Sequence, residues 1–191
     1  MTPASDSLPQ HLEQYLGKID VGWSTPDQAI DAIQIVRFAG AVANGLPFST
    51  LGLSRYELRS RVSAKVIRQE LLMIVPSTLR DGPIPDLLQG VARETRDSER
   101  ALLRGDVIGP RGRLFKNYEM EALYVSEPVY LPDSFGEFSE SGRAEAIVIA
   151  WLVPITHNEA HFVLANGWRA FESMLTELDP DLVDLSRASI V

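Results

Sequence analysis

The sequence predicts one α+β (mixed α/β) domain, residues 1–191, in which helices pack on a mixed β-sheet. Residues 146–153 are eight consecutive apolar residues, which is typical of a strand covered on both faces. Segments rich in branched residues alternate with segments of helical periodicity, and some predicted strands follow one another as in a hairpin. A length of 191 residues is enough to bury one core and short for several domains.

The N-terminal third predicts one helix and one hairpin. Apolar residues recur at helical spacing over residues 8–16, and Gly17 can end that helix with a positive φ. A loop is expected next, because glycine, serine and proline occur at positions 22, 24 and 26. Residues 30–38 are predicted as the first strand and residues 48–53 as its partner, with a turn over residues 40–47.

The middle of the chain predicts a strand, a charged helix and an edge strand. Residues 68–75 begin polar and end apolar, so we expect a strand that enters the sheet from solvent. Asp86 can cap a helix that ends at Gly105 and carries one apolar face and one face of mixed charge. Pro128 confines the strand predicted over residues 121–131 to an edge, or breaks it, and residues 132–143 are predicted as an exposed loop.

The C-terminal part predicts a strand followed by two helices. The core strand is expected to turn at Pro154, after which Thr156 and Glu159 can form a capping box. Asn166-Gly167 ends the first helix, and an apolar stripe beginning at Trp168 indicates a second one. Apolar spacing in the tail favours docking on the body, where Arg187 could pair with a carboxylate, over a frayed terminus.

The chain is acidic, with 18 Lys/Arg against 26 Asp/Glu and a net charge of −8, which argues against nucleic acid as a general partner. Residues 51–116 nevertheless hold 13 Lys/Arg and 8 Asp/Glu, a net of +5, so the remainder carries −13. These charges are either solvated faces, or the two ends of the chain form an acidic surface that steers a basic protein partner.

Composition also bears on the compartment. The chain has no cysteine, so it has neither disulfides nor thiolate metal ligands, which fits a reducing compartment. Its N-terminus lacks the basic start and apolar core of a signal peptide, and its longest apolar run is far shorter than a membrane span. We therefore expect a cytoplasmic protein without a membrane partner.

Motifs for catalysis or cofactor binding are weak. His157 and His161 are four residues apart on one helical face with Glu159 between them, a spacing that could hold a metal, but Asn158 stands where the zinc protease motif needs glutamate. Ser54 lacks the glycine of a nucleophile elbow, and no dinucleotide or phosphate-binding loop occurs. The three tryptophans, at positions 23, 151 and 168, favour core or interface anchors over a ligand cage. The sequence thus predicts no enzyme, no cofactor and no metal site.

Several blocks together resemble the suppressor of fused domain family. They occur in family order and span nearly the whole chain: residues 11–17 (HLEQYLG), 47–54 (PFSTLGLS), 68–76 (RQELLMIVP), 105–108 (GDVI), 154–167 (a strand ending in Pro-Ile-Thr, then Glu, then Asn-Gly) and 184–189 (DLSRAS). The matching residues all have structural explanations as turns, caps or strand ends, so none is carried over as a partner contact; the matching residues are Gly52, Arg68, Glu70, Pro154, Thr156, Glu159 and Gly167.

The resemblance implies a suppressor of fused-like fold and a function in binding proteins. In animals the family's namesake holds a transcription factor of the Hedgehog pathway inactive, whereas bacterial relatives, often lone domains, are associated with polymorphic toxin systems as immunity proteins. Because the chain has no second large domain, the resemblance points to the bacterial group and to a toxin domain as partner. Two alternatives stay open: a regulatory scaffold for an endogenous cytoplasmic partner, and a metal-dependent hydrolase centred on His157 and His161. Partner choice is expected in residues 132–143 and the charged helix, while the interface residues and the oligomeric state are not determined by the sequence.

Overall fold

The computed structural model describes residues 7–24 and 32–191. Its helices are α1 (Leu8–Leu16), α2 (Ile84–Ser98), α3 (His157–Asn166) and α4 (Trp168–Leu178). Its strands are β1 (Ile19–Trp23), β2 (Gln34–Phe38), β3 (Gly45–Leu51), β4 (Leu58–Arg59), β5 (Val66–Pro76), β6 (Val107–Ile108), β7 (Met120–Ser126), β8 (Glu137–Phe138) and β9 (Ile147–Thr156). Short 3₁₀ turns lie at Leu53–Arg55, Ser77–Leu79 and Asp133–Phe135.

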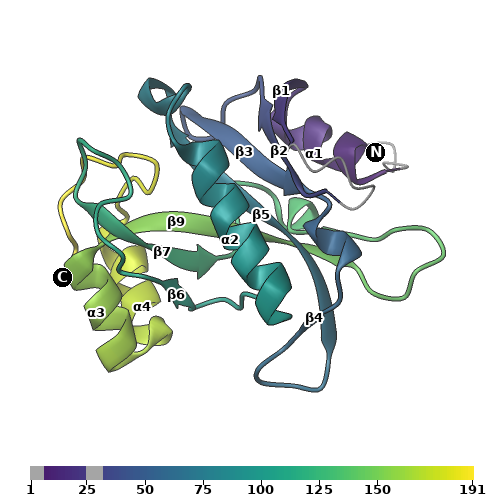
Figure 1. Cartoon of the computed structure of the whole chain (residues 1–191). Helices are drawn as coiled ribbons and strands as arrows, with labels where there is room; N and C mark the ends of the chain where they lie inside the picture. The colour runs from purple at the N-terminus through teal and green to yellow at the C-terminus, as the bar shows by residue number, and fades with distance from the viewer. Residues whose placement is uncertain (1–6, 25–31) are drawn as a thin grey trace.

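The strands of these described residues form one mixed sheet in the order β1-β2-β3-β5-β9-β7-β6, with β4 paired to β5 and β8 to β9. Only β5 and β9 pair in parallel, and every other pairing is antiparallel. The predicted α+β class with a mixed sheet is therefore confirmed. Helix α2 crosses one face of the sheet, which is the face toward the viewer in Figure 1.

Both faces of the sheet are buried, as the apolar run in β9 predicted. Along β5, Leu71 and Met73 belong to the apolar cluster under α2, whereas Leu72 and Ile74 belong to the cluster on the opposite face. That second cluster also contains residues of α1, α3, α4 and the C-terminal tail. Alternation along one strand thus supplies both cores, because successive side chains point to opposite faces.

The first helix follows the prediction, but a strand takes the place of the predicted loop. Helix α1 ends at Gly17, whose φ is 82° and whose missing Cβ leaves room for Gly40; a Cβ there would lie 2.5 Å from the Gly40 nitrogen. Residues 19–23 then pair with β2 as the strand β1 at the end of the sheet. The glycine at position 22 is compatible with this edge, so its turn signal was misleading. Position 26 of the predicted loop lies outside the described residues.

The predicted hairpin is confirmed, but its strand bounds differ. Strand β2 is shorter than predicted, whereas β3 begins at Gly45, three residues before position 48 and inside the predicted turn. Strand β2 starts at Gln34, positions 30 and 31 of the predicted strand lie outside the described residues, and β2 pairs antiparallel with β3. Ala43 and Asn44 adopt positive φ, as the predicted turn requires.

Strand β5 is longer than predicted, and the prediction that its polar start lies in solvent is wrong. Arg68, Gln69 and Glu70 are all buried, with at most 6% of their surface exposed. Buried polar groups persist only where they are hydrogen-bonded. Gln69 donates to the Leu102 carbonyl at 3.2 Å and accepts from the Leu102 N–H at 2.8 Å, and the partners of Arg68 and Glu70 are described below.

Helix α2 is shorter than the predicted helix. It begins after Pro83 without a side-chain cap, and Asp86 lies inside its first turn rather than at its start. It ends at Ser98, because Glu99 adopts a left-handed conformation that stops the helix well before Gly105.

The segment before β9 agrees with the prediction only in part. Strand β7 ends at Ser126, before Pro128, as the alternative of a broken strand predicted, but it lies inside the sheet between β9 and β6, so the edge position is wrong. Residues 132–143 are not simply an exposed loop, because a 3₁₀ turn and β8 lie there and bury Phe135 and Phe138. Pro128 therefore limits the length of β7 but does not place this strand at an edge of the sheet.

The end of β9 also differs from the prediction, whereas the cap that follows it agrees. Pro154 does not turn the chain, since β9 continues to Thr156 and Pro154 pairs with Leu123 of β7. Thr156 and Glu159 form the predicted capping box of α3. Gly167 separates α3 from α4, as predicted, and the tail docks on the body.

Candidate protein-interaction site

One buried carboxylate joins two of the family blocks. Glu70 is fully buried in β5, and its carboxylate accepts hydrogen bonds from the backbone N–H groups of Gly52, Leu53 and Ser54 at 2.8–3.3 Å. It also accepts from the hydroxyls of Thr50 and Ser54, at 2.6 and 2.7 Å. The end of the block at residues 47–54, where β3 runs into a 3₁₀ turn, therefore folds around one acid, and Gly52 has a left-handed φ of 112° that lets three amides face it.

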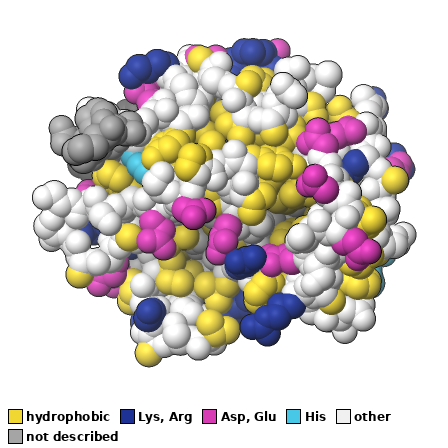
Figure 2. Space-filling model, turned by 180° about the vertical axis from the view of Figure 1, so that it is seen from behind, with side chains coloured by type: hydrophobic (Ala, Val, Ile, Leu, Met, Phe, Trp, Pro, Cys, Tyr) yellow, Lys and Arg dark blue, Asp and Glu magenta, His cyan; other side chains and the backbone are white. Residues whose placement is uncertain are grey.

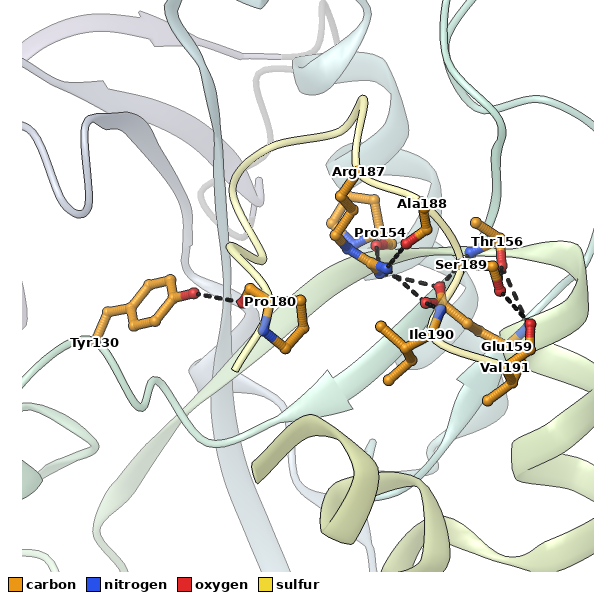
Figure 3. Close-up of polar contacts among 10 residues, drawn as sticks. All are labelled: Tyr130, Pro154, Thr156, Glu159, Pro180, Arg187, Ala188, Ser189, Ile190 and Val191. Atoms are coloured by element: carbon orange, nitrogen blue, oxygen red, sulfur yellow. Dashed lines mark hydrogen bonds and ion pairs between the residues drawn. The ribbon is translucent and has the colours of Figure 1, made fainter. Parts of the chain in front are cut away.

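A second buried carboxylate joins the two C-terminal family blocks, residues 154–167 and 184–189 (Figure 3). Glu159 accepts from the backbone N–H groups of Thr156 and Ile190, at 2.8 and 3.2 Å. Arg187 reaches it with two guanidinium nitrogens, one of them at 2.9 Å, and both side chains are nearly free of solvent. Burial raises the pKa of the Glu159 carboxyl, but the hydrogen bonds and charge of Arg187 outweigh it and leave that pKa below its usual value. The predicted pairing of Arg187 is thus confirmed, and its partner is the capping residue itself.

These two clusters are interior, so they build the scaffold rather than contact a partner. Glu70 and Glu159 are completely buried, and Arg68, which donates to the Ser54 carbonyl at 2.8 Å, is 6% exposed. These contacts agree with the turn expected at Gly52 and with the cap formed by Thr156 and Glu159, whereas Arg68 and Glu70 lie buried within β5 rather than at a solvent-facing strand end.

The histidine pair does not form the predicted alternative metal site. His157 and His161 have ring centroids 4.5 Å apart on the exposed side of α3, and His157 Nδ1 lies 3.1 Å from a carboxylate oxygen of Glu121. Glu159, the third member of that hypothesis, is buried against Arg187 instead. Residues 7–24 and 32–191 contain no group of three or more His, Cys, Asp or Glu side chains arranged to hold a metal ion.

The three tryptophans have different environments. Trp151 is fully buried in β9, and Trp23 stacks on Phe48 with the Arg37 guanidinium 5.9 Å from its ring centre. Trp168 is only partly buried, at the start of α4. Trp168 therefore remains a candidate interface anchor.

Strand β6 ends the sheet with an open edge. It pairs only with β7, and no other strand of the described residues lies along its outer side. The Asp106 carbonyl accepts from the Val125 N–H at 2.9 Å, so the alternation of an antiparallel ladder directs the Val107 N–H and carbonyl away from β7. An exposed edge of this kind can pair with an extended segment of another chain.

A concave surface of about 430 Å³ lies between this edge and α2. We name it the α2–β6 groove. Its base is mostly apolar and also contains the buried Thr95; the apolar residues are Val91, Ala101, Leu102, Val107 and Ile108. Its rim is polar and consists of Arg61, Glu94, Ser98, Arg100, Asp106 and Arg111. Leu164 of α3 borders it and is 65% exposed. An apolar base with a polar rim is the usual composition of a protein interface.

The groove carries more positive than negative side chains. Arg111 donates two hydrogen bonds to Glu94, at 2.7 and 2.8 Å, and this contact lowers the pKa of Glu94. Arg61 pairs with Asp106 across the rim. Arg100 is exposed and has no ion pair among the described residues, so it leaves the groove with one uncompensated positive charge.

The sequence pointed to only part of this surface. It indicated the charged helix, whose residues form one wall of the groove, and residues 105–108, which resemble a family block. It missed β6, because a two-residue strand is too short to produce a hydrophobic period. Residues 132–143, the other expected region, do not line the groove.

A family model described as suppressor of fused protein matches residues 29–188 of the chain. The chain belongs to the suppressor of fused family. The match covers most of the sequence and contains the buried carboxylates Glu70 and Glu159 and both walls of the groove. No curated protein matches the chain.

Solved structures of the suppressor of fused family share the fold at low sequence identity. A suppressor of fused homologue from Neisseria gonorrhoeae is 19% identical, with a TM-score of 0.69 over 95% of this chain and 93% of that one. A chain of the Sufu–Fu complex is 16% identical, with a TM-score of 0.68 over 96% and 90%. Drosophila Suppressor of Fused is 16% identical, with a TM-score of 0.58 over 83% of this chain and 42% of that longer one.

Within the described residues, no helix has the length and hydrophobicity that a membrane crossing requires.

Proposed function

We propose that this chain is a protein-binding module that receives an extended segment of its partner in the α2–β6 groove. The open edge of β6, with an apolar base beside it, is the observation that carries the proposal. Main-chain hydrogen bonds to the edge supply affinity in this mode of recognition, and pockets for side chains supply selectivity. The Sufu–Fu complex supports a protein partner, because a chain of the same fold occurs there together with a protein.

For the partner we propose a cognate toxin domain, which the chain neutralises in the cytoplasm as an immunity protein. Two segments on the side of the sheet away from α2 are acidic and contain no exposed cation: residues 127–138 hold three carboxylates, and residues 177–186 hold four. They lie side by side, because the Tyr130 hydroxyl accepts from the Leu182 N–H at 3.0 Å. Acidic side chains lie beside and below an area of hydrophobic ones on that face, together with a few Lys or Arg side chains (Figure 2). A basic toxin such as a nuclease would be attracted by this field, which raises the rate of association.

Co-expression tests the immunity function. A toxin domain encoded beside this chain should stop growth when it is expressed alone and should allow growth when the chain is present. The purified pair should form a complex whose association rate falls as salt is added, because screening weakens the acidic field. Absence of protection, together with binding to an endogenous cytoplasmic protein, would favour the regulatory scaffold instead.

Val107→Pro tests the groove. The Val107 N–H points away from β7, so proline removes a donor that the fold does not use, and the free energy of unfolding should change by less than about 1 kcal/mol. Partner affinity, measured by calorimetry, should fall about tenfold or more, since one edge hydrogen bond is lost and the ring blocks close approach.

Val107→Ala is the matched control, because it trims the side chain but keeps the backbone donor. It should bind nearly as tightly as the wild type. Equal affinity of the proline variant and the wild type would show that the partner does not use this edge.

A further inference from the structure

Trp168 lies beside one end of the α2–β6 groove in a fixed position. Gly105 lines the groove, and a Cβ on it would lie 2.4 Å from the Trp168 ring, so the indole packs directly on that backbone. Leu164 of α3, which borders the same groove, is four residues before Trp168 in the sequence, on the other side of the break at Gly167. A segment of partner that leaves the groove past Gly105 would therefore meet the exposed side of this indole.

Two arginines flank the indole, and only one of them has a carboxylate partner. The Arg104 guanidinium, 5.3 Å from the ring centre, donates to both oxygens of Glu172 at 2.9 and 2.7 Å and also pairs with Glu127. The Arg169 guanidinium, 4.9 Å from the ring centre, is exposed and has no hydrogen bond or ion pair among the described residues. Arg169 is therefore held near the ring while all its donors stay available.

The surface around these two residues is a shallow, open depression that is supported from below. Trp168 and Arg169 lie at one end of a depression of about 600 Å³ along α4. Tyr124 donates to Glu172 at 2.9 Å, which fixes the Arg104–Glu172 pair beneath the indole. Glu177 lines the same depression, but it is eight residues from Arg169, or about 12 Å along the helix axis. Tryptophan and arginine on a rigid support have the composition of interface hot spots.

We propose that Trp168 and Arg169 form an anchor for an aspartate or glutamate side chain of the partner, with an adjacent apolar side chain of the partner lying on the indole. The inference rests on the proposed function, because the same partner segment occupies the α2–β6 groove. A carboxylate matches the planar guanidinium fork of Arg169 and is the group that Arg104 already binds beside it. A basic partner can carry one acidic side chain at this contact. The acidic segments attract the net charge of the partner during its approach, whereas the anchor acts only at hydrogen-bond distance.

Random 12-residue peptides displayed on phage provide a probe that needs no identified partner. Selection on the wild type, followed by removal of peptides that also bind Val107→Pro, should leave peptides that use the strand edge. These peptides should share an aspartate or glutamate next to an apolar residue. Synthetic copies should bind Arg169→Glu and Trp168→Ala roughly 30-fold more weakly than the wild type by fluorescence anisotropy, as expected for hot-spot residues.

Charge exchange and a matched variant make the test specific. A peptide in which lysine replaces the acidic residue should recover its affinity on Arg169→Glu, a variant whose substitution is exposed and should not affect folding. Arg93→Glu, an exposed arginine of α2 outside the groove, should leave binding unchanged. Edge-dependent peptides that bind Arg169→Glu and Trp168→Ala as tightly as the wild type would contradict the proposed anchor but not the proposed binding in the α2–β6 groove. Recovery of no edge-dependent peptide would overturn both.

Discussion

Replacing Glu70 by leucine should lower the free energy of unfolding by about 4 kcal/mol, even though Glu70 contacts no solvent and no partner. Leucine removes the acceptor for the N–H groups of Gly52, Leu53 and Ser54, which stay buried in the folded chain. Each buried donor without an acceptor costs about 1–3 kcal/mol, and partial relaxation of the loop keeps the total below the sum. Urea denaturation measures this difference directly.

Two further variants separate the cause from a general effect of substitution. Glutamine has the same shape as glutamate and keeps one acceptor oxygen, although its NH₂ group faces the backbone donors. Glu70→Gln should therefore lower the free energy of unfolding by less than Glu70→Leu does. Glu57→Leu, an exposed carboxylate in the same part of the chain, should change stability by about 0.5 kcal/mol or less. A loss below about 1 kcal/mol for Glu70→Leu would mean that the loop finds other acceptors.

Arg187→Ala should destabilise the chain by about 3–5 kcal/mol at neutral pH, because it leaves Glu159 as a buried carboxylate without its cation. Arg143→Ala removes an exposed arginine that pairs with Glu140, and it should cost about 1 kcal/mol or less. The contrast between two arginine deletions isolates the effect of burial. Equal losses would contradict the ion pair as the stabilising contact.

The pH dependence of the same variant gives a second readout. In the wild type the Glu159 pKa lies below its unfolded value of 4.5, so its stabilisation is complete above about pH 4.5 and is lost as the pH falls through the lowered folded value. Without Arg187, burial dominates and raises the pKa of Glu159. Protonation of Glu159 in mild acid then removes the buried charge that destabilises the variant. The deficit of Arg187→Ala should therefore be larger at pH 7 than at pH 4. A deficit that is the same at both values would assign the loss to packing.

The sequence predicted those features whose causes lie within a few residues or within one element. The capping box joins Thr156 and Glu159 across three positions, and the buried strand at residues 147–153 is a continuous apolar run. The polar start of β5 was misplaced for the opposite reason. Glu70 looks like a solvent-facing residue until the loop around Gly52, 18 positions earlier, is folded onto it.

The candidate site depended almost wholly on distant contacts. The groove needs α2 and β6 to lie side by side, and Trp168 needs Gly105, 63 positions earlier in the chain, to come beneath its ring. Neither contact can be read from the local sequence. A two-residue strand is too short to show a hydrophobic period, and a glycine indicates only that another group can approach its backbone closely, without identifying that group.

The sequence by itself determined the α+β class, the family and the cap of α3, since these follow from apolar patterning and from short motifs. It favoured docking of the tail but did not identify Glu159, 28 positions earlier, as the partner of Arg187. Only the tertiary structure decided which strands end the sheet, where Pro154 lies and which arginines in and beside the groove, Arg100 and Arg169, have no carboxylate partner in the part of the chain that the structure describes. The physical reason is that an open edge and an unpaired charge are defined by what does not pack against them, and packing is known only when the whole chain has folded.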